Sequence, residues 1–149
     1  MARLTLVSAL YYQDPRAALD FLERAFGFER QMVITDDDGN IGHAEMRFGD
    51  GYIMVGGEWA DWAKSPKSMG GANSQDVHAQ VDSDVDAHCE RARAAGAVIV
   101  QEPEDQFYGA RIYRAMDPEG HMWTFEQFLA DVSREEAERT SGLKIEGWV

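Results

Sequence analysis

The chain has 149 residues, a length that suits one compact domain or two tightly joined half-domains. Its 14 basic and 27 acidic residues give a net charge of −13, which repels phosphate backbones and anionic membranes, so we expect neither nucleic acid nor a membrane among its partners. The single cysteine, Cys89, excludes a disulfide framework and predicts a small buried thiol. The opening residues show no cleavable signal pattern and no apolar run approaches about 18 residues, so we expect a cytoplasmic protein.

The first half of the chain predicts a strand, a helix and then three strands. Asp14 followed by Pro15 is typical of a helix start, and Gly27 is a suitable stop. Short segments rich in Asp and Gly separate the later strands, as in tight hairpins. The expected strands lie at residues 4–12, 29–35, 41–48 and 52–55.

The same order of elements returns in the second half of the chain. Asp82-Ser83-Asp84 caps a second helix, with Asp82 lying 68 residues after Asp14, and Gly96 ends it. The expected strands lie at residues 76–81, 97–101, 110–116 and 121–127, with a loop at 101–109. The sequence therefore predicts an α+β fold in which a βαβββ module occurs twice, forming a cup-shaped mixed sheet with the helices outside.

These patterns divide the chain into four parts. We expect a first module at residues 1–56, a linker at 57–75, a second module at 76–128, and a C-terminal helix and tail at 129–149. The linker is rich in Gly, Ser and Pro but also contains Trp59 and Trp62. Two interpretations stay open: a plain linker with one short helical turn, or a flap that lays a tryptophan over a ligand.

The tail has its own pattern. Ser133 and Glu136 form a capping box for a helix that runs to about Arg139. The apolar residues beyond that helix predict a segment that docks on its own body or on a partner subunit.

The closing hairpin carries the most informative stretch of the sequence. Its turn is Asp117-Pro118-Glu119-Gly120, with Pro and Gly where a tight turn requires them. Side chains then alternate along the last strand. Its aromatic face should be buried, and the face with Met122, Thr124 and Glu126 should meet water or a ligand, as the wall of a binding cup would. His121 begins the aromatic face and is expected to anchor the turn.

The doubled βαβββ order, together with Asp117-Pro118-Glu119-Gly120-His121-Met122-Trp123 and the 81–87 segment, resembles the vicinal oxygen chelate superfamily. This superfamily includes glyoxalase I, bleomycin-resistance proteins, fosfomycin-resistance enzymes and extradiol dioxygenases, and the chain looks closest to its glyoxalase-like (PhnB-like) branch. The resemblance implies metal-ligand positions at Val7, Asp76 and Thr124 and on the fourth strand. These positions offer one credible ligand, so we expect no metal cofactor.

Two polar residues are candidates for catalysis. His78 and Glu126 lie on parallel neighbouring strands, two residues beyond the ligand positions that the resemblance implies. A His–Glu pair in a partly dry cup suits a general base. A structural hydrogen bond, an exposed His at a strand end, or half of a metal site in a shifted register are the alternatives.

Other residues are expected to bind the ligand. They would give the cup an apolar and aromatic lining with a few polar groups. Among these, Arg111 would either bind a carboxylate or planar anion at the mouth of the cup or form ordinary salt bridges with the many acidic residues. The expected ligand-binding residues are Tyr11, Tyr52, Met54, Trp59, Trp62, Gln80, Tyr108, Arg111, Met122 and Thr124.

Three functions follow from these observations. The first is a metal-free binding protein of the bleomycin-resistance type, a homodimer that holds a hydrophobic or aromatic small molecule. The second is a metal-dependent lyase, isomerase or dioxygenase resembling glyoxalase I, or a lyase that uses His78 and Glu126. The third is an interaction module whose acidic surface and tail serve a partner protein.

Overall fold

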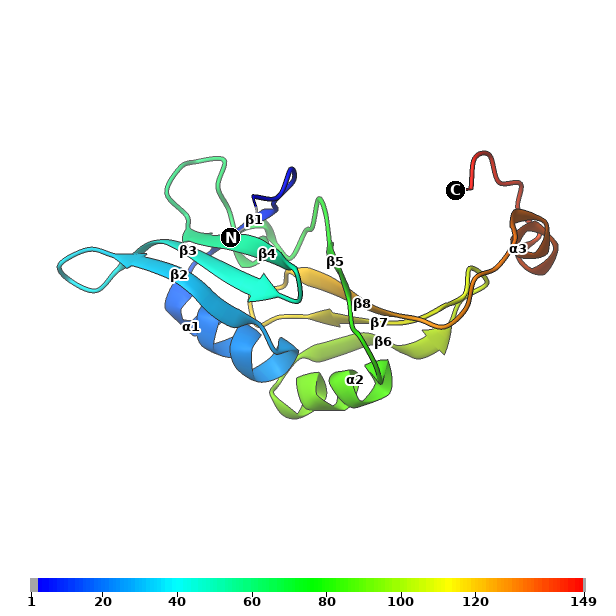
Figure 1. Ribbon diagram of the computed structural model, residues 1–149. Helices are drawn as coiled ribbons and strands as arrows, with labels where there is room; N and C mark the ends of the chain where they lie inside the picture. The colour runs from blue at the N-terminus through cyan, green and yellow to red at the C-terminus, as the bar shows by residue number, and fades with distance from the viewer. Residues whose placement is uncertain (1–2, 149) are drawn as a thin grey trace.

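A computed structural model describes residues 3–148 and contains two four-stranded mixed sheets (Figure 1). The first sheet has the order β1-β4-β3-β2 and the second β5-β8-β7-β6, with the first and last strands of each module parallel. The strands are β1 (Ala9–Tyr12), β2 (Glu29–Thr35), β3 (Ile41–Phe48), β4 (Gly51–Gly57), β5 (Val77–Gln80), β6 (Val98–Asp105), β7 (Ala110–Met116) and β8 (Met122–Phe128). The predicted α+β fold of two βαβββ units is confirmed.

Each sheet is covered by one helix, and the two helices lie on corresponding sides of their sheets (Figure 1). Helix α1 (Pro15–Phe21) begins at Asp14, whose carboxylate accepts from the Ala17 amide, and continues as the π-helical turn η1 (Leu22–Phe26). Gly27 ends it in the left-handed conformation, with φ at 81°. Helix α2 (Val85–Ala94) packs on the second sheet and contacts η1, so the two modules share one core.

A half-buried histidine joins the two helices. His88 Nε2 lies 2.8 Å from the Phe26 carbonyl, which can only accept, so Nε2 carries the proton. Nδ1 then accepts from the Tyr113 hydroxyl at 2.5 Å. Burial lowers the pKa of His88, which favours the neutral ring that this arrangement requires.

The turn between β7 and β8 fastens the second module to the first. Asp117 accepts from the Tyr12 hydroxyl at 2.7 Å, and burial raises the pKa of this carboxyl. The Glu119 carboxylate accepts from the backbone amides of Gln13 and Asp14, at the start of α1. His121 donates from Nε2 to the Tyr11 carbonyl at 2.7 Å, so it anchors the turn as predicted. These contacts place the start of β8 beside the end of β1.

Some boundaries differ from the prediction. Strand β1 begins at Ala9 rather than at residue 4, and β6 runs to Asp105 through the segment predicted as a loop. Strand β6 lies at the edge of its sheet and pairs with β7 through an irregular register. No strand lies on the outer side of β6, so the missing backbone N–H of Pro103 breaks no hydrogen bond there. Cys89 is fully buried, as predicted.

The C-terminal segment extends away from both sheets (Figure 1). Helix α3 (Arg134–Ser141) begins at Ser133, whose hydroxyl accepts from the Glu136 amide at 3.2 Å. Within the residues described up to 148, the Trp148 indole donates to the Val132 carbonyl at 2.9 Å, so the apolar end packs on the tail itself and not on either sheet (Figure 1). Docking on a partner, the other predicted alternative, stays a prediction. Exposed apolar side chains line this segment at Phe128, Leu129 and Leu143. Between residues 3 and 148, no helix has the length and apolar character needed to cross a membrane.

Candidate functional site

Each sheet has a side that faces away from its helix, and we call these two sides together the cup face. Cross-strand partners share a side, because side chains alternate along a strand. On the first sheet the pairs Tyr11–Gly56 and Ala9–Met54 lie on the cup face. On the second sheet it carries His78 with Thr124, and Gln80 with Glu126. The opposite sides are buried, as Tyr12, Val55, Trp123 and Phe125 show.

The linker encloses a small pocket beside β1 and β8, which we call the aromatic pocket. It has a volume of about 240 Å³, and Tyr11, Trp62 and Met122 contribute to its lining. Tyr11 and Trp62 meet edge to face with ring centroids 5.8 Å apart, and Trp59 continues the series 5.0 Å from Trp62. Trp62 and Trp59 are nonetheless 67% and 70% exposed.

Hydrogen bonds hold the linker in place. Ser65 is fully buried just before the short 3-10 helix η2 (Pro66–Met69), and its amide donates to the Glu58 carboxylate within the linker at 2.7 Å. The Lys67 amide donates to the Glu119 carbonyl of the turn between β7 and β8 at 3.0 Å. The Asn73 amide group donates to the Gly120 carbonyl and accepts from the Met122 amide. The linker is thus attached to the start of β8, and this arrangement favours a flap over a plain connecting segment.

A second group of residues, the polar cluster, lies further along β5 and β8. His78 Nε2 is 3.1 Å from Glu126 Oε2, and Gln80 also donates to this carboxylate. The His78 side chain is 47% exposed and that of Glu126 only 15%. A groove of about 800 Å³ runs along β5 and is lined by His78, Gln80 and Tyr52. The structure brings the two predicted catalytic residues together, and their role in catalysis stays a prediction.

The polar cluster also contains an arginine that the sequence reasoning did not select. Arg114 on β7 is the cross-strand partner of Thr124, and its Nε donates to the threonine hydroxyl at 3.2 Å. That hydroxyl donates in turn to Asp76 at 2.6 Å, which leaves Thr124 fully buried rather than open to a ligand as predicted. Arg114 Nη1 donates to Gln101 at 2.5 Å. Side chains alternate along β7 and Tyr113 is buried, so Arg114, the next residue, belongs on the opposite side, the cup face.

Arg111, predicted to grip a ligand, lies on the other side of the sheet. It is three residues from Arg114, so alternation turns the two side chains to opposite sides. Its guanidinium binds Asp86 of α2 at 3.1 Å and Asp105 of β6 at 2.9 Å. Arg111 therefore forms salt bridges away from the cup face, and a ligand-binding role for it stays a prediction. Tyr108 lies near the polar cluster. Burial is the main cause that raises the pKa of its hydroxyl, and the negative charge of Glu126 is the second.

The positions at which the family resemblance implies metal ligands do not fit a divalent cation. Val7 has no donor atom, and the Thr124 hydroxyl is already shared between Asp76 and Arg114. The positive guanidinium beside Thr124 would repel a cation there.

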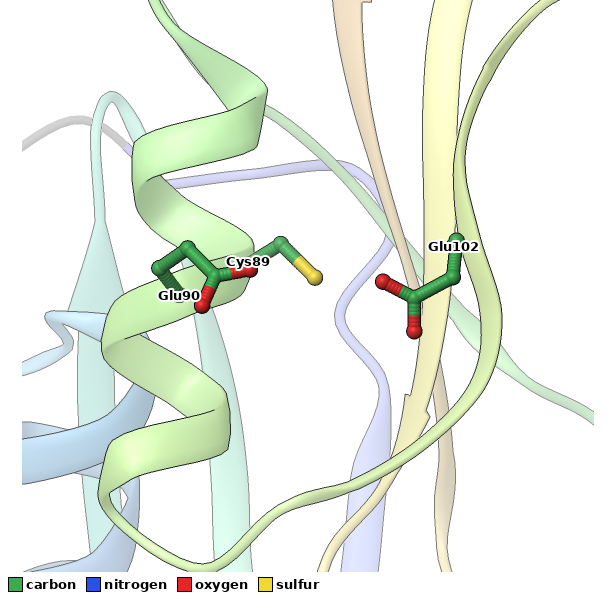
Figure 2. A group of neighbouring side chains, drawn as sticks. All are labelled: Cys89, Glu90 and Glu102. Atoms are coloured by element: carbon green, nitrogen blue, oxygen red, sulfur yellow. The ribbon is translucent and has the colours of Figure 1, made fainter.

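Figure 2 shows a second group with metal-ligating atoms, in which Cys89 and Glu90 of α2 face Glu102 of β6. Their ligand atoms lie within 4.8 Å of one another. The Arg93 guanidinium already binds both carboxylates and approaches Cys89 Sγ to 3.9 Å. Burial raises the pKa of the thiol to about 11, so it stays protonated at neutral pH. This group is an ion-pair cluster around an arginine and does not fit a metal.

Comparisons with known proteins agree with this architecture. The sequence profile of the Glyoxalase/Bleomycin resistance protein/Dioxygenase superfamily matches residues 4–125. Uncharacterised proteins of Mycobacterium bovis and Mycobacterium tuberculosis are 30% identical over 142 residues, covering 93% of this chain and 92% and 82% of theirs.

Among solved structures, TioX from a Micromonospora species is 37% identical, with a TM-score of 0.68 and coverage of 85% of this chain and 100% of TioX. The fosfomycin resistance protein FosX from Listeria monocytogenes shares the fold at 16% identity, with a TM-score of 0.62 and coverage of 92% and 99%. The chain belongs to the glyoxalase/bleomycin resistance protein/dioxygenase superfamily.

Proposed function

We propose that this protein binds a hydrophobic or aromatic small molecule on its cup face, in the manner of a bleomycin-resistance protein and without a metal ion. The observation that carries the proposal is the series Tyr11–Trp62–Trp59, which lines and then extends the aromatic pocket. Exposed tryptophans cost free energy in water, and an aromatic ligand stacked on them would recover it. A linker attached to the turn between β7 and β8 by Ser65, Lys67 and Asn73 holds the rings in position before a ligand arrives.

The donor atoms available on the cup face support the metal-free part of this proposal. Val7 offers none, and Arg114 lies beside the hydroxyl of Thr124. A stoichiometric content of nickel, zinc, iron or manganese in the purified protein would contradict it, and would favour a metal-dependent lyase, isomerase or dioxygenase instead.

A second candidate function is proton transfer, as in a glyoxalase-like lyase or isomerase. The hydrogen bond of 3.1 Å between His78 and Glu126 favours it, because a carboxylate can orient an imidazole that removes a proton from a bound substrate. The groove that His78 borders gives a substrate access to the imidazole.

We also propose the PhnB-like branch for this chain, with modules at residues 1–56 and 76–128, and a homodimer in solution. The exposed side chains of Phe128 and Leu143 support the dimer, because their burial against a second copy would be favourable.

Thermal melts with neutral aromatic compounds such as 2-naphthol test the binding function. Saturation at about 100 times Kd would stabilise the folded state by about 2.7 kcal/mol. We expect this shift in the native chain and in Trp148→Ala, whose ring lies in the C-terminal segment, but not in Trp62→Ala. A native chain that responds to no aromatic compound would contradict the proposal.

A further inference from the structure

Arg114 lies on the cup face of the second sheet and has no charged partner. Among the residues that the structure describes, Arg93 and Arg111 each bind two carboxylates and Arg91 donates to backbone carbonyls of η1, whereas Arg114 forms no ion pair. Its Nε and Nη1 donate to Thr124 and Gln101, which are neutral acceptors. The chain has 27 acidic and 14 basic residues, yet the hydrogen-bond partners of Arg114 are neutral. Its positive charge therefore has no carboxylate partner and can bind an anionic group of a ligand.

The surrounding hydrogen bonds fix the orientation of this guanidinium. Thr124 Oγ1 donates to Asp76 at 2.6 Å, so the lone pairs of the hydroxyl are left to accept from Arg114 Nε. Gln101 holds Nη1 from the neighbouring strand β6. Within residues 3–148, Nη2 has no hydrogen-bond partner, and the side chain is half-buried on the cup face.

Two carboxylates near Arg114 have other donors. Glu126 accepts from His78 and Gln80, and Asp76 accepts from Thr124. The two carboxylates make the electrostatic potential around Arg114 more negative. Within the described part of the chain, however, neither of them forms an ion pair with Arg114. A planar oxyanion of a ligand can therefore bind the free edge of the guanidinium with charge-assisted hydrogen bonds.

We propose that Arg114 binds the carboxylate of the ligand whose apolar part occupies the aromatic pocket, so that the ligand class is an aromatic carboxylic acid. This inference rests on the proposed binding function. Met122 of the pocket and Thr124, the partner of Arg114, lie two residues apart on β8, which corresponds to roughly 7 Å. One or two fused rings with a carboxylate span that length.

Isothermal titration calorimetry with 2-naphthoate and 2-naphthamide tests the inference, because the two probes share a ring system and differ in charge. We expect the native chain to bind the acid at least about tenfold more tightly than the amide. Arg114→Gln should abolish this preference while leaving the amide affinity unchanged. Arg111→Gln changes an arginine of the same strand on the opposite side and should keep the preference. Arg114→Lys, which retains charge without the planar fork, should keep part of it and serves if Arg114→Gln does not fold.

The outcomes separate the inference from the function on which it rests. Equal binding of acid and amide by the native chain, with both lost in Trp62→Ala, would overturn the inference and leave the binding function intact. A preference that survives Arg114→Gln, or that Arg111→Gln removes equally, would also overturn it. Failure of both probes to bind the native chain would count against both.

Discussion

The Tyr12 hydroxyl donates a hydrogen bond of 2.7 Å to Asp117 Oδ2, and thereby joins β1 of the first module to the last turn of the second. The two residues are 105 positions apart in the chain and both are buried. Trp123 donates to the same oxygen at 3.2 Å. The aromatic pocket lies beside this junction, so the contact that holds the modules together also positions Tyr11 and Met122.

Removing the Tyr12 hydroxyl should weaken the junction. We expect Tyr12→Phe to lower the free energy of unfolding by about 1–3 kcal/mol, because a buried carboxyl loses one of its donors. Urea denaturation measures the change. Tyr11→Phe is the matched control, since the Tyr11 ring is half-buried and its hydroxyl has no hydrogen bond within residues 3–148. Equal effects of the two variants would contradict the assigned role of the Tyr12–Asp117 contact.

Stability should fall in mildly acidic solution because of His88. Burial lowers the pKa of His88 in the folded state, whereas the unfolded chain retains a pKa of about 6.5. The unfolded state therefore binds the proton at a higher pH, and the stability that neutral His88 contributes is present above about pH 6.5 and is lost as the pH falls through the folded pKa. We expect the difference in unfolding free energy between pH 8 and pH 5 to be smaller in His88→Gln. An unchanged difference would exclude His88 as the cause.

The loop before β7 depends on glycine at position 109. Gly109 has φ at 85°, and a Cβ atom there would lie 2.0 Å from the Ala130 carbonyl oxygen. Gly109→Ala should cost more than about 2 kcal/mol or displace the C-terminal segment, because backbone blocks the added methyl group. Gly39→Ala is the control, since φ is 83° but no atom lies within 4 Å, and about 1 kcal/mol of strain is expected. Thermal melts that rank the two variants equally would contradict this steric explanation.

The contact between His78 and Glu126 should matter little for folding. Because the His78 side chain is 47% exposed, His78→Ala should change the free energy of unfolding by no more than about 0.5 kcal/mol. Denaturation in urea gives this value, with the fully buried Val85→Ala as a variant of large expected effect. A loss of about 2 kcal/mol in His78→Ala would assign the pair a structural role and weaken the case for proton transfer.

The C-terminal segment should be dispensable for folding but not for assembly. Helix α3 lies away from both sheets, so a chain ending at residue 132 should keep the melting temperature within a few degrees (Figure 1). Sedimentation velocity should give a dimer for the full chain and a weakened dimer for the shortened one, because the exposed apolar side chain of Leu143 is lost. A monomeric full chain would contradict the proposed homodimer, and an equally stable shortened dimer would exclude the tail from its interface.

Much of the fold could be predicted from local patterns. Strands β2, β3 and β7 begin and end at the predicted residues, because alternating side chains are bounded by turn residues in each case. Strand β6 was predicted too short, since Pro103 and its acidic neighbours oppose a strand unless they lie at an edge.

The candidate site was harder to predict than the fold. His78 and Glu126 could be paired from the parallel arrangement of their strands. The choice between Arg111 and Arg114 depends on which side of β7 packs under α2, and Asp86 of that helix takes Arg111. The burial of Thr124 depends on two side chains from other strands, so composition and spacing do not indicate it.

By itself, the sequence determined the two βαβββ modules, the helix start at Asp14, a second helix start within residues 82–84, and the alternation along β8, because each depends on residues only a few positions apart. The tertiary structure alone decided which arginine faces the cup and that the Thr124 hydroxyl lies between Asp76 and Arg114. Those outcomes depend on the register between strands distant in the chain, and a shift of one residue would turn every side chain to the opposite side.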